Sequence, residues 1–174
     1  MDTKIRKIIY VAACASLFII LGRFATIDFG NLKITLKSLP IYVGAITLGP
    51  IEGALIGFVG ELVLQLTGQY GFTATTLFWV LPYVVIGAIC GMAFENKAIK
   101  INGGIKYGIF IVSLQVLLSI LNTIVLFVDS LIFGYYSFVL VFGSLVGRLM
   151  LSILTGIVYS VVLPFIINAI KKIH

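Results

Sequence analysis

The sequence predicts an all-α integral membrane protein, built as a bundle of six transmembrane helices. Of its 174 residues, 61% are hydrophobic and 10% are charged. Soluble domains are roughly 45–50% apolar and about a quarter charged, so most of the surface of this chain must face lipid. The apolar residues also fall into runs, and about 20 of them in succession span a bilayer. We expect a single membrane domain over residues 1–174.

Short polar or glycine-bearing segments separate six apolar runs. The second run is short and has Pro40 near its start, and Gly49-Pro50 separates it from the third. Before it, the polar residues 23–37 end in an alternating pattern that is compatible with a short strand or an extended lid. The predicted helices cover residues 8–24, 38–49, 51–67, 74–94, 107–128 and 138–170.

The basic residues predict the orientation in the membrane. With six spans both termini lie on one side, and three basic residues, Arg23, Lys33 and Lys37, lie on the other. Basic residues collect on the cytoplasmic side, so we expect both termini in the cytoplasm. The first run has no A-x-A-like cleavage site after it and continues into Arg23, so we expect it to be a retained helix. The basic residues on the side of the termini are Lys4, Arg6, Lys7, Lys97, Lys100, Lys106, Lys171 and Lys172.

The charge of +6 does not indicate nucleic-acid binding, because the basic residues form short clusters between apolar runs. Cys14 and Cys90 lie inside such runs without a CxxC spacing, which argues against a metal site or a disulfide framework. Paired carboxylates, a nucleophile elbow, a Walker sequence and an HExxH motif are all missing from the sequence. We therefore expect neither an enzyme nor a resident cofactor.

A carboxylate interrupts the third apolar run. Glu61 at that position costs about 2.5–3.5 kcal/mol in lipid unless it has a partner or faces a cavity, and Gln65 follows one helical turn later. Trp79, Asn122 and Arg148 lie in the outward halves of three later runs. These side chains at similar depth predict a ligand cavity that opens at the outer face of the membrane.

Alternatives exist for each of these residues. Glu61 and Arg148 could instead form a purely structural ion pair between the third and sixth helices, and Trp79 could be an interface anchor. The outward loops add basic and aromatic side chains that could cap a ligand or remain in water. The candidate substrate-binding residues are Glu61, Gln65, Trp79, Arg148, Asn122, Arg23, Lys33, Lys37, Tyr70 and Phe72.

Several stretches resemble the substrate-binding S components of energy-coupling factor (ECF) transporters. Residues 12–16 read AACAS, and residues 38–61 read SLPIYVGAITLGPIEGALIGFVGE, which contains L-G-P-x-x-G-A-L-x-G. A polar turn follows this stretch. Together with the small size and the six runs, the resemblance covers nearly the whole chain. It implies a six-helix bundle in a bacterial plasma membrane, with an outward vitamin pocket capped by the first and third loops.

The resemblance also implies partners. An S component assembles with a transmembrane coupling subunit and two ATPase subunits. The AxxxA docking motif of the family corresponds to Ala12 and Ser16, and the serine departs from the strict pattern. Small residues at this spacing let another helix approach closely.

Within the group, the chain is most similar to the folate branch. A carboxylate such as Glu61 could accept two hydrogen bonds from a pterin, and Trp79, Tyr70 or Phe72 could stack on the ring. Arg23, Lys33 or Lys37 could meet the glutamate carboxylates.

Other readings remain open. Cobalamin, pantothenate or another vitamin could be the substrate. A solitary carrier or channel would transport without ATPase partners, although no inverted repeat is visible. A scaffolding membrane subunit would bind no small molecule.

Overall fold

The computed structural model describes residues 3–29, 32–68, 71–101 and 104–173. All six predicted runs are helical, and a hairpin occupies the segment where alternation indicated a strand. Strands β1 (Thr26–Phe29) and β2 (Leu32–Thr35) pair antiparallel. The helices are α1 (Thr3–Phe24), α2 (Leu39–Leu48), α3 (Pro50–Leu66), α4 (Thr76–Glu95), α5 (Ile105–Ile132), α6 (Phe138–Phe142) and α7 (Leu145–Ile173).

Among the described residues, four stretches are long and apolar enough to cross a membrane. They are Lys4–Phe24, Thr76–Glu95, Ile105–Ile132 and Phe138–Ile170. Helices α2 and α3 have 10 and 17 residues, whereas a full span takes about 20. The prediction of six helices therefore holds, but the structure gives full spanning length to four of these segments.

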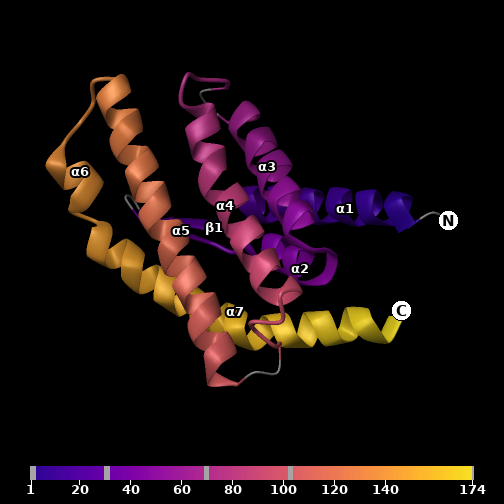
Figure 1. Ribbon diagram of the computed structural model, residues 1–174. Coiled ribbons are helices and arrows are strands. Elements are labelled where there is room, and N and C mark those ends of the chain that lie inside the picture. Colours follow the sequence, from indigo (N-terminus) through magenta and orange to yellow (C-terminus); the bar gives the residue numbers. More distant parts are fainter. Residues whose placement is uncertain (1–2, 30–31, 69–70, 102–103, 174) are drawn as a thin grey trace.

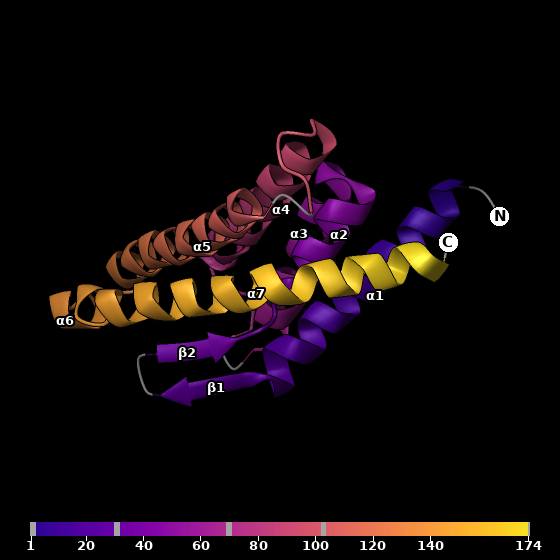
Figure 2. The ribbon, with the colours of Figure 1, turned by 90° about the horizontal axis from the view of Figure 1, so that it is seen from below.

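Helices α3 and α4 pack closely because glycines line their contact. A Cβ atom on Gly57 would lie 2.6 Å from the carbonyl oxygen of Tyr83, and one on Gly53 would lie 2.9 Å from the carbonyl oxygen of Gly87. Helix α1 packs on α2 and α3, while α5 packs on α7. Figure 1 shows both termini at the same end of the molecule, and Figure 2 shows the hairpin beside α7.

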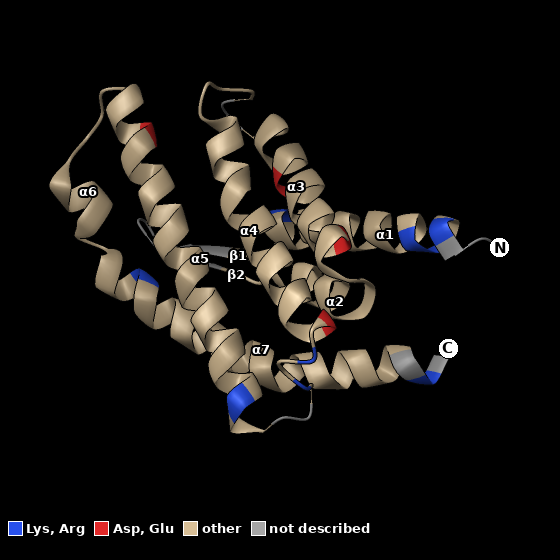
Figure 3. Cartoon of the chain, in the orientation of Figure 1, with Lys and Arg blue, Asp and Glu red and all other residues tan. Residues whose placement is uncertain are grey.

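Apolar side chains fill the interior and also cover much of the outside. Tyr42, Ile56 and Tyr159 are fully buried, while Ile105 and Phe165 are 81% and 74% exposed. Charged residues are sparse along the helices and gather mainly near their ends, as Figure 3 shows. This distribution is expected for a protein whose surrounding solvent is hydrocarbon.

The sixth predicted run is divided. The prediction was one helix over residues 138–170, but α6 ends at Phe142 and α7 begins at Leu145. A Cβ atom on Gly143 would overlap the carbonyl oxygen of Val139, so glycine permits this break. As a result, Arg148 lies in the first turn of α7, where its backbone N–H donates to the Ser144 carbonyl at 2.9 Å.

Candidate ligand cavity

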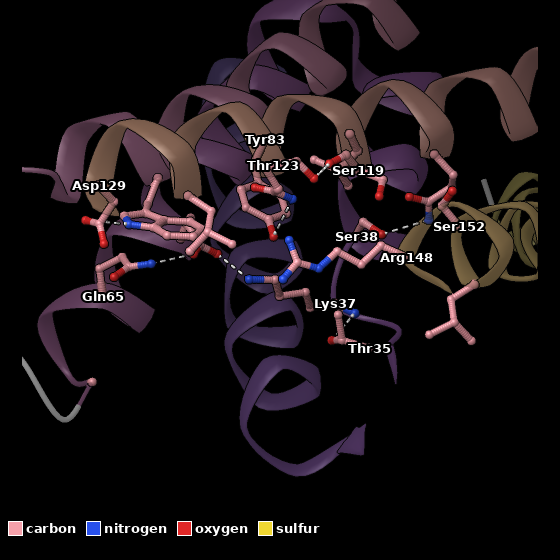
Figure 4. Close-up of a pocket in the computed structure, with 18 of the residues that line it drawn as sticks. Thr35, Lys37, Ser38, Gln65, Tyr83, Ser119, Thr123, Asp129, Arg148 and Ser152 are labelled. Atoms are coloured by element: carbon pink, nitrogen blue, oxygen red, sulfur yellow. Dashed lines mark hydrogen bonds and ion pairs between the residues drawn. The ribbon is translucent and has the colours of Figure 1, made fainter. Parts of the chain in front are cut away.

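A cavity of about 880 Å³ lies between α3, α4, α5 and α7, next to the end of β2. Six of the predicted substrate-binding residues line it, and Figure 4 shows the side chains that surround it. The cavity is polar for a membrane bundle, and it contains two basic and two acidic side chains. The six predicted residues are Lys37, Glu61, Gln65, Trp79, Asn122 and Arg148.

The other four predicted residues lie elsewhere. Arg23 donates a hydrogen bond to the carbonyl of Thr67, the residue that follows α3, and does not line the cavity. Phe72 is 65% exposed and is also outside the lining. Tyr70 and the side chain of Lys33 fall outside the described residues.

Glu61 forms an ion pair with Lys37. The Lys37 Nζ atom lies 2.7 Å from Glu61 Oε2, and Gln65 Nε2 donates to Oε1 at 2.9 Å. The Lys37 ammonium also lies 4.4 Å from the ring centroid of Tyr83, a cation–π contact. Burial alone would lower the pKa of Lys37, but the Glu61 carboxylate outweighs burial and the pKa lies above its ordinary value.

This pairing corrects the alternative in which Glu61 pairs with Arg148. Lys37 follows β2 by two residues, so the hairpin delivers it beside α3. The pairing also weakens the argument for folate, because both carboxylate oxygens of Glu61 already accept hydrogen bonds within the protein.

Arg148 and Asn122 have unused hydrogen-bonding capacity in the cavity. Arg148 is half-buried and points into the cavity in Figure 4, and its guanidinium has no carboxylate partner among the described residues. Asn122 Nδ2 donates to Tyr83 at 3.5 Å, whereas its Oδ1 is buried without a partner there. A free donor and a free acceptor therefore face the same space.

Hydroxyl groups from α5 and α7 complete the lining. Thr123 donates its proton to the Ser119 carbonyl at 2.9 Å, and Thr155 donates to the Leu151 carbonyl at 2.9 Å. Ser152 donates to the Leu149 carbonyl at 2.7 Å. Since each proton is used by the helix backbone, the oxygen lone pairs remain for a ligand that brings donors.

Sequence reasoning missed Asp129. Its carboxylate accepts hydrogen bonds from Thr75, Trp79 and Tyr135, and it lines the cavity. The predicted helix ended at residue 128, which left Asp129 in a turn, but α5 continues to Ile132. The sequence does contain a signal that could have identified Asp129, namely an acidic residue directly after a long apolar run.

The predicted docking residues lie on the outside of α1. Ala12 and Ser16 are both exposed, and Ser16 Oγ donates to the Ala12 carbonyl at 2.9 Å. The Ser16 hydroxyl is therefore hydrogen-bonded within its own helix, and its side chain adds little bulk to the surface of α1.

Comparisons with known proteins identify a matching family and several curated relatives. The family model described as "ECF-type riboflavin transporter, S component" matches residues 2–172. A UPF0397 protein of Clostridium perfringens is 31% identical over 104 residues, which are 59% of this chain and 54% of that protein. A UPF0397 protein of Streptococcus thermophilus is 34% identical over 92 residues, which are 52% of this chain and 49% of that protein.

A UPF0397 protein of Enterococcus faecalis is 27% identical over 116 residues, which are 62% of this chain and 61% of that protein. The chain thus spans about half to three-fifths of the length of the curated relatives it matches. The resemblance to S components is confirmed, the family is not enzymatic, and the folate branch is not the one that the matching model names. Because the match extends over nearly the whole sequence, the chain belongs to the family of S components of ECF-type riboflavin transporters.

Proposed function

We propose that this chain is the vitamin-binding subunit of an ATP-driven ECF importer and that its cavity binds riboflavin. The proposal is carried by two groups in one cavity that has Trp79 in its wall: among the described residues, the Arg148 guanidinium has no carboxylate partner and Asn122 Oδ1 has no hydrogen-bond partner. A volume of about 880 Å³ lies within the range of about 300–1,000 Å³ that is typical of sites for ligands of drug size.

The chemistry of riboflavin suits this lining. The pyrimidine edge of its ring system alternates carbonyl acceptors with an N–H donor, which complements a guanidinium and an amide oxygen. Its sugar-alcohol chain carries hydroxyl donors for the Ser and Thr lone pairs of α5 and α7. Lys37 already balances Glu61, and Arg148 and Asp129 carry opposite charges, so a neutral ligand leaves the cavity charges balanced.

Folate is the second candidate, because Arg148 could bind a carboxylate in a bidentate way. The pterin recognition that we expected from Glu61 would, however, have to displace Lys37 or Gln65 from its oxygens. Riboflavin requires no such exchange and is the vitamin in the name of the matching family.

The proposal includes the partners and the orientation expected from the sequence. A coupling subunit in the membrane and two ATPases would drive transport, with both termini in the cytoplasm and a single membrane domain. The small, exposed pair Ala12 and Ser16 on α1 supports a docking role for that helix. Uptake into liposomes by the chain alone would instead favour a solitary carrier.

The test is a binding titration of the purified protein with riboflavin and, separately, with folate. We expect saturable riboflavin binding that Arg148→Ala weakens about tenfold or more, the equivalent of about 1.4 kcal/mol. Arg23→Ala is the matched control, since Arg23 contacts Thr67 outside the cavity, and it should leave the affinity unchanged. Folate binding without riboflavin binding would refute the riboflavin assignment, and binding of neither vitamin would refute the proposed function.

A further inference from the structure

Three hydrogen-bond donors converge on the carboxylate of Asp129. Thr75 Oγ1 and Trp79 Nε1 both donate to Oδ1, the latter at 3.4 Å, while the Tyr135 hydroxyl donates to Oδ2. Asp129 is only 9% exposed. A carboxylate this buried with neutral donors on both oxygens is held in a fixed orientation, because hydrogen bonds to an ionised acceptor are stronger than neutral ones.

The donors come from two segments that border the cavity. Thr75 directly precedes α4, and Trp79 lies in the first turn of that helix. Tyr135 belongs to the connection between α5 and α6. In that connection Gly134 has a φ of +73°, and the Tyr135 N–H donates to the Ser130 carbonyl at 3.1 Å. The chain thereby turns back towards α5, and Tyr135 reaches Asp129.

Most of this cluster faces the proposed ligand site. Asp129, Trp79 and Tyr135 line the cavity, as does Phe133 in the same connection. Figure 4 shows Asp129 at one end of the group of lining residues and Ser152 at the other. The network therefore lies at one end of the group of lining residues, where it ties Trp79 of α4 to the connection between α5 and α6.

We infer that Asp129 is a positioning residue for ligand binding. It orients the indole of Trp79 for stacking on a planar ring, and it holds residues 133–135 against the end of the cavity. The inference rests on the proposed function, which supplies the planar ligand.

The indole has a single donor, its N–H. Anchoring that donor at the ring edge fixes the plane of the ring and leaves its face for the ligand.

If Asp129 served only to hold α4 against α5, fewer hydrogen bonds would be enough. The Thr75 hydroxyl alone links the start of α4 to Asp129. Two further donors on aromatic side chains that face the cavity indicate a role in its geometry. A wall that is ordered before the ligand arrives lowers the entropy cost of binding, and such a gain is expressed mainly in slower dissociation.

The chain has one tryptophan, so fluorescence that is excited selectively at the indole reports on Trp79 alone. In the ligand-free protein, we expect Asp129→Ala to accelerate the local motion of the indole in time-resolved anisotropy. Asp129→Asn should give an intermediate result, because the amide keeps one acceptor oxygen. Thr75→Val should loosen the indole less than Asp129→Ala, because it removes one donor to Oδ1 but keeps the carboxylate that accepts from Trp79. Ser113→Ala is the matched control, since the Ser113 hydroxyl donates to the Ile109 carbonyl on the exposed side of α5 and does not line the cavity.

The second measurement is riboflavin dissociation in stopped-flow experiments. We expect Asp129→Ala to raise the dissociation rate about tenfold with little change in the association rate. Tyr135→Phe should raise the dissociation rate without freeing the indole, which separates the two roles of the carboxylate. Asp129→Asn serves for both measurements if the alanine variant does not fold.

Each result bears on the inference. An indole that is equally ordered in the wild type and in both Asp129 variants would overturn it, and this measurement needs no ligand. A freed indole with an unchanged riboflavin dissociation rate would also overturn it. If the wild type binds no riboflavin while the indole responds as expected, the proposed function fails and the positioning of Trp79 by Asp129 stands.

Discussion

Lys37 connects the hairpin side of the molecule to α3 through its ion pair with Glu61. Glu61 is 3% exposed and Lys37 is 15% exposed, so removing the ammonium leaves a buried carboxylate without its counter-ion. Breaking one side of a buried pair costs about 3–5 kcal/mol. We therefore expect Lys37→Met to lower the stability of the purified protein by about this amount, measured as the free energy of unfolding in detergent.

The double variant Lys37→Met/Glu61→Gln is the control, and it should recover much of the loss because no unpaired charge remains. The raised pKa of Lys37 means that the pair stabilises the fold fully below the unfolded pKa of about 10.4, and that this contribution is lost only as the pH rises through the folded value. The contribution of Lys37 to the stability of the wild type should therefore not vary near neutral pH. A single variant as stable as the wild type would show that the pair contributes nothing.

Glu61 illustrates what could and could not be predicted from the sequence. A carboxylate inside an apolar run predicts a cavity or a partner on energetic grounds alone, and the structure provides both. Its partner was not predictable, because helical phase places residues on spans but says nothing of the path of residues 23–37. That path places Lys37, and not Arg148, beside Glu61.

Asp129 was missed for a related reason. The end of the predicted helix was set by the loss of apolar residues, one position before Asp129. Such boundaries are uncertain by a few residues, because the last turn of a helix can be polar when it has internal partners. Here Thr75, Trp79 and Tyr135 supply those partners, and no local pattern in the sequence indicates that they meet.

At the scale of elements, the contact between α3 and α4 depends on glycine. A Cβ atom on Gly57 would lie 2.6 Å from the Tyr83 carbonyl oxygen, and backbone atoms cannot move aside as the end of a side chain can. We expect Gly57→Ala to destabilise the protein by about 1–3 kcal/mol, the usual cost of overpacking. Thermal unfolding in detergent, followed by circular dichroism, measures this effect.

Gly108 on α5 provides the matched control. A Cβ atom there would meet its nearest neighbour, Ser160, only at 3.9 Å. Gly108→Ala should therefore be neutral or stabilising by up to about 1 kcal/mol, because alanine favours helix. Equal effects of the two substitutions would contradict the packing argument. The sequence shows the spacing of the α3 glycines Gly53 and Gly57, but only the structure shows that α4 is the helix that packs against them.

At the scale of the whole molecule, two close helix pairs enclose the cavity. Helices α3 and α4 form one pair and α5 and α7 the other, and all four contribute lining side chains. The number and order of these helices followed from hydropathy. The short second and third helices also followed, since residues 38–49 and 51–67 were expected and α2 and α3 match them closely. The division of the last run at Gly143 did not, because a continuous apolar run does not show where a helix breaks.

The outer surface of α1 leads to the last prediction. Ala12 and Ser16 are exposed and small, and they lie away from the cavity lining. If a coupling subunit packs there, a large side chain must prevent the close approach of its helix. We expect Ala12→Trp and Ser16→Trp each to abolish co-purification with the coupling subunit and ATP-dependent vitamin uptake, while riboflavin binding by the isolated chain stays unchanged.

Leu154→Trp is the control, because Leu154 is 56% exposed on α7 and also faces outward. It adds the same bulk to the lipid-facing surface and should leave assembly intact. Intact assembly in both α1 variants would exclude this face of α1 as the docking surface. Loss of assembly in the α7 variant as well would show that added bulk on either helix prevents assembly. The effect could then not be assigned to the small residues of α1, and they would not be the specific contact of the coupling subunit.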